Sequence, residues 1–115
     1  MSAIPIRGEV WRANLDPVRG HEQGRVRPVV VASNNVFNRG PGELVTVIPI
    51  TSKFRPIRAH LRINPPEGGL PQISYVICDQ IRTISRDRLS RRFGVLSKTT
   101  MAEVDERLKL LLALS

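Results

Sequence analysis

Apolar and polar positions alternate in short runs along most of residues 1–98, a pattern typical of half-buried β-strands. Glycine, proline and asparagine separate the runs, and these residues favour turns. Residues 33–42 are especially rich in turn formers, so we expect a loop there with room for one helical turn. The pattern predicts strands over residues 8–15, 28–31, 44–50, 60–63, 74–78 and 92–96, with the strand over 74–78 running on through Asp79 and Gln80 into residues 81–84.

A long helical period occurs only near the C-terminus, over residues 101–111. Thr100 with Glu103 fits a capping box, although Ser97 is a competing N-cap. Further leucines widen the apolar face beyond one stripe, so either the helix is broadly buried or part of it meets a second subunit. Several short strands and one terminal helix favour a small, mostly antiparallel β-barrel with a C-terminal α-helix.

The chain of 115 residues fits one domain with a single core. Its one cysteine, Cys78, cannot form an internal disulfide, and we interpret it as a buried small hydrophobe in a protein of a reducing compartment. The chain has no apolar run of the ~20 residues that a membrane span needs, and its first residues lack a signal pattern. We therefore expect a cytoplasmic protein that does not enter the membrane.

The formal charge of +8 lies in the body of the chain. Residues 1–98 hold sixteen Arg and Lys against seven Asp and Glu, whereas residues 99–115 hold two against three. Fifteen of the eighteen cations are arginines, whose planar fork can bond two phosphate oxygens at once. These features indicate a polyanion as partner, with an acidic protein as the alternative.

Polar clusters mark the ends of three predicted strands: Arg25 and Arg27, then Thr51 and Ser52, then Asp79 and Gln80. If these ends meet, the cluster suits RNA cleavage by the substrate's own 2′-hydroxyl, which requires alignment and charge stabilisation but no metal ion. The two histidines lie far apart in the sequence, and no spacing fits a metal site, so we expect neither metal nor cofactor. A solvated loop and surface ion pairs are the simpler alternative for the same residues.

Three separate motifs carry a resemblance to a known family. Residues 16–31, with Gly20-His21-Glu22-Gln23 and Arg27-Pro28-Val29, resemble the opening signature of the MazF/PemK (Kid) toxin endoribonucleases of bacteria. The similarity continues through residues 49–52 and 78–84, in matching order and spacing. It implies an SH3-like barrel of the PemK/CcdB type, formed by residues 1–115 as one toxin domain and assembled as a homodimer in the bacterial cytoplasm.

The same resemblance implies a sequence-specific, metal-independent endoribonuclease. Such an enzyme cuts single-stranded mRNA, leaves a 2′,3′-cyclic phosphate and a 5′-hydroxyl, and arrests growth until an antitoxin with an acidic, flexible C-terminal segment neutralises it. Arg27 would contact the scissile phosphate, and Thr51 matches the catalytic threonine or serine position. Some relatives carry a catalytic arginine where this chain has Ile77, which shifts the catalytic weight to Arg27.

The remaining candidates would bind RNA. The loop after the first strand would cover the RNA, the residues after position 51 would contact phosphates and stack on a base, and polar side chains near position 80 would read base edges. The predicted RNA contacts are His21, Glu22, Gln23, Arg25, Asn38, Ser52, Lys53, Phe54, Arg55, Asp79, Gln80 and Arg82.

Two other functions fit the same fold. The gyrase-targeting CcdB toxins share it and act only by binding protein, but they do not need the combination of Arg27 and Thr51. A plain SH3-like RNA-binding module is the other alternative. Five aromatic residues scattered along the chain argue against the stacking platform that such a module uses.

Overall fold

The computed structural model describes residues 4–115, which form seven strands, two α-helices and three short 3₁₀-helices. The strands are β1 (Glu9–Asn14), β2 (Val26–Val31), β3 (Leu44–Thr51), β4 (His60–Ile63), β5 (Ser74–Ile77), β6 (Arg82–Ser85) and β7 (Leu89–Val95). The helices are α1 (Asn35–Arg39), η1 (Glu67–Gly69), η2 (Cys78–Gln80), η3 (Arg86–Arg88) and α2 (Lys98–Leu112).

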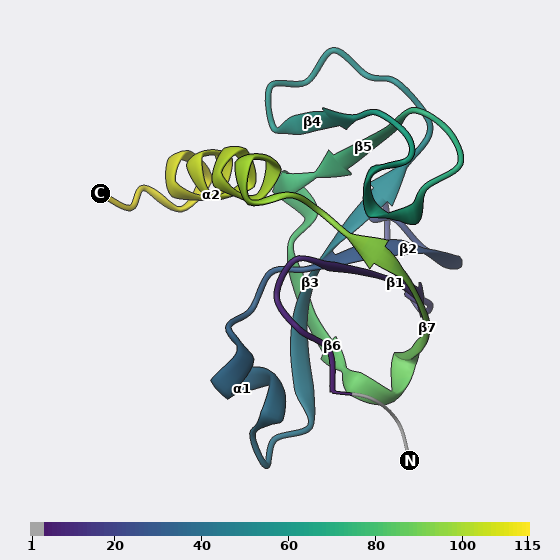
Figure 1. Cartoon of the computed structure of the whole chain (residues 1–115), viewed down its shortest axis with the longest axis vertical. Helices are drawn as coiled ribbons and strands as arrows, with labels where there is room; N and C mark the ends of the chain where they lie inside the picture. Colours follow the sequence, from purple (N-terminus) through teal and green to yellow (C-terminus); the bar gives the residue numbers. More distant parts are fainter. Residues whose placement is uncertain (1–3) are drawn as a thin grey trace.

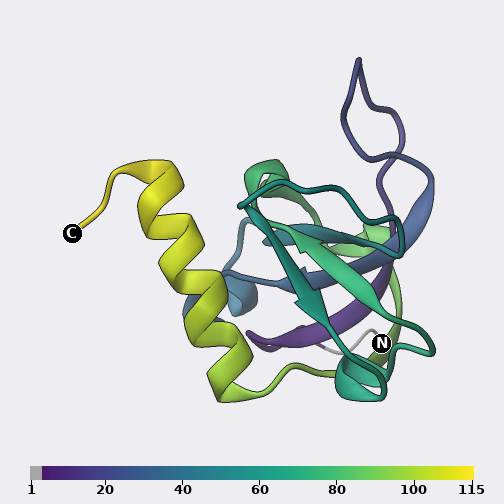
Figure 2. The same cartoon turned by 90° about the horizontal axis from the view of Figure 1, so that it is seen from above.

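The strands form one antiparallel sheet in the order β4-β5-β3-β2-β1-β7, with β6 paired to β3. The sheet curls around its core, and α2 lies along one side while the β1–β2 loop projects from the other (Figures 1 and 2). The predicted mostly antiparallel fold with a C-terminal helix is confirmed. The expected barrel is not closed, however, because no pairing joins β4 to β7 in the described part of the chain.

The valine run of β2 is buried on both faces of the sheet. Val30 belongs to an apolar cluster that also contains Met101 and Val104 of α2. Val29 and Val31 point to the opposite face and pack in a second cluster with Trp11. Because side chains alternate along a strand, β2 contributes to both clusters. This burial fixes the backbone at the point where the β1–β2 loop enters β2.

Helix α2 begins one turn before the predicted capping box. The Ser97 side chain is the N-cap and accepts a hydrogen bond from the Thr100 backbone N–H at 3.1 Å, so the competing N-cap is correct and Thr100 is not the cap. Only Met101 and Val104 are buried, and Leu110 is 76% exposed. Broad burial of this helix within one chain is therefore excluded, and its C-terminal end presents an uncovered apolar surface. No helix among residues 4–115 has the length and apolar character to cross a membrane.

The thiol of Cys78 should be inert in the folded protein. Its side chain is buried, and burial raises the pKa of the thiol to about 11. The thiol therefore stays protonated below that pH, and at pH 8 only about one molecule in a thousand carries the reactive thiolate. Iodoacetamide at pH 8 should leave the native protein unlabelled by mass spectrometry and label it in urea. Rapid labelling without denaturant would show that Cys78 is accessible.

Candidate active site

Two of the three predicted strand ends meet in space. The last pair between β2 and β3 is Val29 with Pro49, and Arg27 and Thr51 each lie two residues beyond that pair. Arg27 and Thr51 both line a cleft of about 510 Å³. The pairing of two neighbouring strands thus brings together a guanidinium and a hydroxyl that are 24 residues apart in the sequence (51 − 27).

The cleft carries positive charge without acidic neighbours. Arg27 and Arg91 both line it, and no Asp or Glu is among its lining residues. A phosphate can accept two parallel hydrogen bonds from a guanidinium, so this composition fits an anionic group. The rest of the lining comes from the ends of β2 and β3, from the connection between η1 and β5, and from β7: Val26, Pro28, Ile50, Ser52, Gly69, Leu70, Pro71, Gln72, Ser74 and Phe93.

One of the three nitrogen atoms of the Arg27 guanidinium makes a hydrogen bond within residues 4–115, and the other two do not. Its Nε donates a hydrogen bond to the Gly24 carbonyl at 2.8 Å, which fixes the plane of the group. Within residues 4–115 neither Nη atom makes a hydrogen bond, and Arg27 forms no ion pair. The simpler reading of Arg27 as half of a surface ion pair therefore does not hold, and its two outer nitrogens are available to a ligand.

The Thr51 hydroxyl has a defined acceptor role that leaves its proton free. Thr51 Oγ1 accepts a hydrogen bond from the Lys53 backbone N–H at 3.1 Å, as a residue that caps a strand end does. A hydroxyl that accepts one hydrogen bond can still donate its own. Thr51 can therefore donate to an oxygen of a phosphate held beside Arg27.

The third strand end lies away from the cleft. Asp79 and Gln80 are in η2, and neither lines the cavity around Arg27 and Thr51. Asp79 Oδ1 is instead 3.6 Å from His60 Nε2. The condition that all three polar clusters meet is therefore not fulfilled for Asp79 and Gln80, which do not line this cleft.

Gln80 anchors the β1–β2 loop. Its Oε1 accepts a hydrogen bond from the Gln23 backbone N–H at 2.7 Å, and its Nε2 donates to the His21 carbonyl at 3.2 Å. Arg82 supports the start of the same loop by donating from Nη1 to the Leu15 carbonyl at 3.1 Å. These two side chains hold the loop through its backbone, and His21 and Gln23 lie in the anchored segment.

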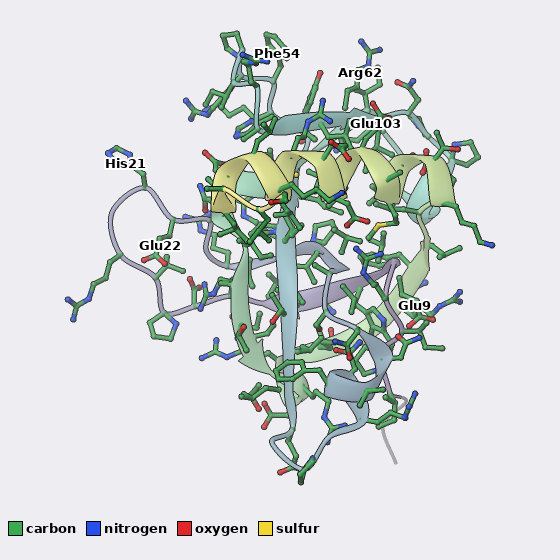
Figure 3. All side chains as sticks on the ribbon, turned by 90° about the vertical axis from the view of Figure 1, so that its left-hand side faces the viewer. Glu9, His21, Glu22, Phe54, Arg62 and Glu103 are labelled. Atoms are coloured by element: carbon green, nitrogen blue, oxygen red, sulfur yellow. The ribbon has the colours of Figure 1, made fainter. Side chains whose placement is uncertain are left out.

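The loop carries the other candidates on exposed positions. His21 projects from the tip, away from the body of the molecule (Figure 3). Glu22 Oε1 accepts a hydrogen bond from the Arg19 backbone N–H at 2.7 Å, so this carboxylate closes a local turn. Arg25 adopts a positive φ of 62° and donates its backbone N–H to Asp16 Oδ1 at 2.8 Å, while its side chain is exposed. None of these residues lines the cleft.

Asn38 is not a surface residue. Its side chain is 0% exposed, and its Nδ2 donates hydrogen bonds to the carbonyls of Pro5 at 3.2 Å and Ser33 at 3.1 Å. The amide ties α1 to two neighbouring segments of backbone. The expectation that Asn38 contacts RNA is therefore wrong, because the side chain is enclosed and its donors are used.

The segment after β3 connects the cleft to the surface. Ser52 lines the cleft, and Lys53, Phe54 and Arg55 follow it on exposed positions. Figure 3 shows Phe54 at the outer edge of the molecule. A chain that leaves the cleft past Ser52 would therefore meet two cations and an aromatic ring.

Arg91 and Gln72 are cleft residues that the motifs did not indicate. Gln72 lies in an irregular connection, and no local pattern predicts that this connection lines the same cleft as the start of β2. Arg91 lies within a strand, and the only signal in the sequence was the run of two arginines at positions 91 and 92. Among residues 4–115, no group of three or more His, Cys, Asp or Glu side chains is arranged to hold a metal ion.

Whether Gln80 restrains the β1–β2 loop can be tested by substitution. Gln80→Ala removes both hydrogen bonds to the β1–β2 loop, each worth about 1 kcal/mol. We expect trypsin to cut after Arg19 or Arg25 several-fold faster in the variant, because local opening of the loop becomes more frequent. Urea unfolding serves as the control and should show a loss of no more than about 2 kcal/mol. Unchanged proteolysis would show that Gln80 does not restrain the loop.

Comparison with known proteins identifies the family. A family model described as "PemK-like, MazF-like toxin of type II toxin-antitoxin system" matches residues 6–112. The chain is 38% identical to "Endoribonuclease EndoA" of Bacillus subtilis over 112 residues, which cover 96% of this chain and 97% of the relative.

Solved structures agree with the sequence comparison. The crystal structure of MazF from Deinococcus radiodurans superposes with a TM-score of 0.87 at 27% identity and covers 98% of this chain and all of the other. A mycobacterial endoribonuclease in complex with its cognate antitoxin superposes with a TM-score of 0.78 at 25% identity, over 99% of this chain and 98% of that one. The chain belongs to the PemK-like, MazF-like toxins of type II toxin–antitoxin systems.

Proposed function

We propose that this endoribonuclease cuts single-stranded mRNA in the bacterial cytoplasm without a metal ion, by attack of the RNA's own 2′-hydroxyl on the adjacent phosphate. The observation that carries the proposal is the free edge of the Arg27 guanidinium beside the Thr51 hydroxyl, in a cleft without acidic residues. The B. subtilis relative is named an endoribonuclease, which supports the same activity.

The chemistry needs charge stabilisation more than an enzyme nucleophile. The 2′-oxygen forms a bond to phosphorus, the bond from phosphorus to the 5′-oxygen breaks, one proton leaves the 2′-hydroxyl and one reaches the 5′-oxygen. The products are a 2′,3′-cyclic phosphate and a 5′-hydroxyl. Negative charge grows on the non-bridging oxygens in between, where the Nη atoms of Arg27 and the Thr51 hydroxyl can donate hydrogen bonds. Arg91 of β7 adds a second positive charge to the lining of the cleft.

The exposed candidates would hold the RNA on either side of the cleft and make the cut sequence-specific. His21, Glu22 and Arg25 would contact RNA from the β1–β2 loop, and Ser52 to Arg55 from the segment after β3. Asp79 is partly exposed and can accept a hydrogen bond from a base edge. Gln23, Gln80 and Arg82 would act through the loop whose shape they hold.

The antitoxin would compete for the same basic surface. A solved relative is an endoribonuclease with its cognate antitoxin, and a flexible acidic segment that folds on binding would complement the cations of the cleft. We also propose that residues 1–115 act as one toxin domain in a homodimer. The uncovered leucines at the end of α2, including Leu110 and Leu111, supply an apolar surface for a second copy.

The experiment is digestion of a mixed RNA in excess EDTA, followed by mapping of the cut sites and of the chemistry at each end. We expect cuts at a short recurrent sequence, a 2′,3′-cyclic phosphate on one side and a 5′-hydroxyl on the other. Cleavage that depends on added Mg²⁺ would contradict the proposal. RNA binding without cleavage would support the plain binding module, and gyrase-dependent DNA breaks in a parallel assay would support the gyrase-targeting alternative.

A further inference from the structure

A second cavity lies beside the cleft, on the outer face of β4 and β5. It has a volume of about 320 Å³, and its lining includes Phe54, Arg55, Arg58, His60, Arg62 and Tyr75. No Asp or Glu lines it. The catalytic roles proposed for Arg27 and Thr51 make no use of this cavity.

We propose that this cavity is a nucleobase subsite, which takes an unpaired base of the RNA next to the scissile phosphate; the inference rests on the proposed RNA cleavage. Phe54 is 66% exposed, although a phenylalanine ring is costly to leave in water. It meets Tyr75 edge-on, with the ring centroids 5.6 Å apart and an interplanar angle of 61°. This contact fixes the Phe54 ring and leaves a face open, on which a base can stack.

The cations around the two rings fit the backbone of the same nucleotide. Arg55, Arg58 and Arg62 line the cavity, and none of them forms an ion pair with a described residue. Arg62 Nε donates to Asn64 Oδ1 at 3.0 Å, which positions its guanidinium without neutralising it. Phe54 and Arg62 project from the same edge of the molecule in Figure 3. Aromatic rings with arginines at their border are the usual composition of a single-strand binding surface.

His60 is a largely buried lining residue of the cavity. Its side chain is only 5% exposed, its Nε2 faces Asp79, and its buried Nδ1 has no hydrogen-bond partner among residues 4–115. A buried polar atom without a partner is costly and in native proteins calls for a ligand or water. Because Nδ1 is buried, a base in the cavity does not reach it, and the open face of the Phe54 ring carries the recognition of the base.

The strand pairing connects the cavity to the cleft. Thr51 pairs with Tyr75 across β3 and β5, so the hydroxyl proposed to act on the phosphate lies one strand away from the subsite. On β5, Ser74 lines the cleft and Tyr75 lines the cavity. On the segment after β3, Ser52 lines the cleft and Phe54 lines the cavity. An RNA whose scissile phosphate lies at Arg27 can therefore pass over the segment after β3 and place the base of a neighbouring nucleotide on Phe54.

The test measures binding of a short RNA that carries the mapped cut site with deoxyribose at that site, so that binding is separated from cleavage. Phe54→Ala should weaken binding about tenfold, the loss of one base stack, and Phe54→Trp should keep the wild-type affinity. Phe37→Ala is the matched control, since Phe37 is also an exposed phenylalanine but lies on α1. Circular dichroism should show the same fold for all three variants.

The outcomes separate this inference from the proposed function. If the wild-type protein cuts RNA but Phe54→Ala binds as tightly as Phe37→Ala, the subsite is overturned and the cleavage proposal stands. If a randomised RNA is bound in a Phe54-dependent way but never cut, the subsite stands and the cleavage proposal falls. Phe54-dependent binding of a Glu-rich peptide without any such effect on RNA would also overturn the subsite.

Discussion

Arg27→Ala should lower the rate of RNA cleavage by about a hundred- to a thousandfold, equivalent to about 3–4 kcal/mol of lost transition-state stabilisation. The reason is the free edge of its guanidinium, which lies in the cleft beside Thr51 and has no acidic partner within residues 4–115. Single-turnover cleavage of a fluorescent RNA measures the effect. The fold should survive, because the bond from Arg27 Nε to the Gly24 carbonyl is the only side-chain hydrogen bond that the substitution removes among residues 4–115.

Two further variants test whether the geometry or the charge of the Arg27 side chain is responsible for its effect on the cleavage rate. Arg27→Lys keeps the positive charge but loses the planar fork, so we expect it to restore only part of the rate. Arg39→Ala removes an exposed arginine at the end of α1 and should leave the rate unchanged, apart from a small effect of net charge. Cleavage by Arg27→Ala at the wild-type rate would exclude Arg27 from the reaction.

Gly69→Ala should destabilise the protein by about 3 kcal/mol, because two penalties add at this position. A Cβ at Gly69 would lie 2.0 Å from the Phe93 carbonyl oxygen, and the backbone there has a φ of +70°. Either η1 or β7 must move to make room. Since Gly69, Arg91 and Phe93 all line the cleft, the same displacement should reduce RNA cleavage in the molecules that remain folded.

Gly20→Ala is the matched control, because it measures the cost of a positive φ without a steric clash. Gly20 also has a positive φ, of +60°, but nothing lies within 4 Å of the position its Cβ would take. This variant should lose only about 1 kcal/mol. Urea unfolding followed by circular dichroism compares the two substitutions. Equal stabilities would contradict the close approach of η1 to β7.

Local patterns in the sequence predicted most of the elements. The strand over residues 60–63 coincides with β4, and every other predicted strand overlaps an observed one, because alternation of apolar side chains is a local property. The N-cap of α2 required a choice between Ser97 and Thr100, which only the geometry of the chain before the helix decides. The open edge between β4 and β7 could not be predicted, because closure of a sheet depends on strands far apart in sequence.

The candidate site was predictable where strand register determines it. Arg27 and Thr51 come together because β2 and β3 are neighbours and their ends coincide. Gln80 could not be placed in the same way, since it lies in the turn η2, where side-chain direction follows no simple alternation. Asn38 looked like a polar loop residue, and its burial depends on the carbonyl groups of Pro5 and Ser33, which accept hydrogen bonds from its side chain. Arg91 reaches the cleft only through the pairing of β7 with β1.

The most direct test of the mechanism is cleavage of an RNA that carries a single 2′-deoxyribose on the 5′ side of the mapped cut site. If the RNA supplies its own nucleophile beside Arg27 and Thr51, the deoxy RNA should bind but remain uncut at that site, while the all-ribose RNA is cut to a 2′,3′-cyclic phosphate. Cleavage of the deoxy site at a comparable rate would contradict the account, because the nucleophile would then have to come from water or from the protein.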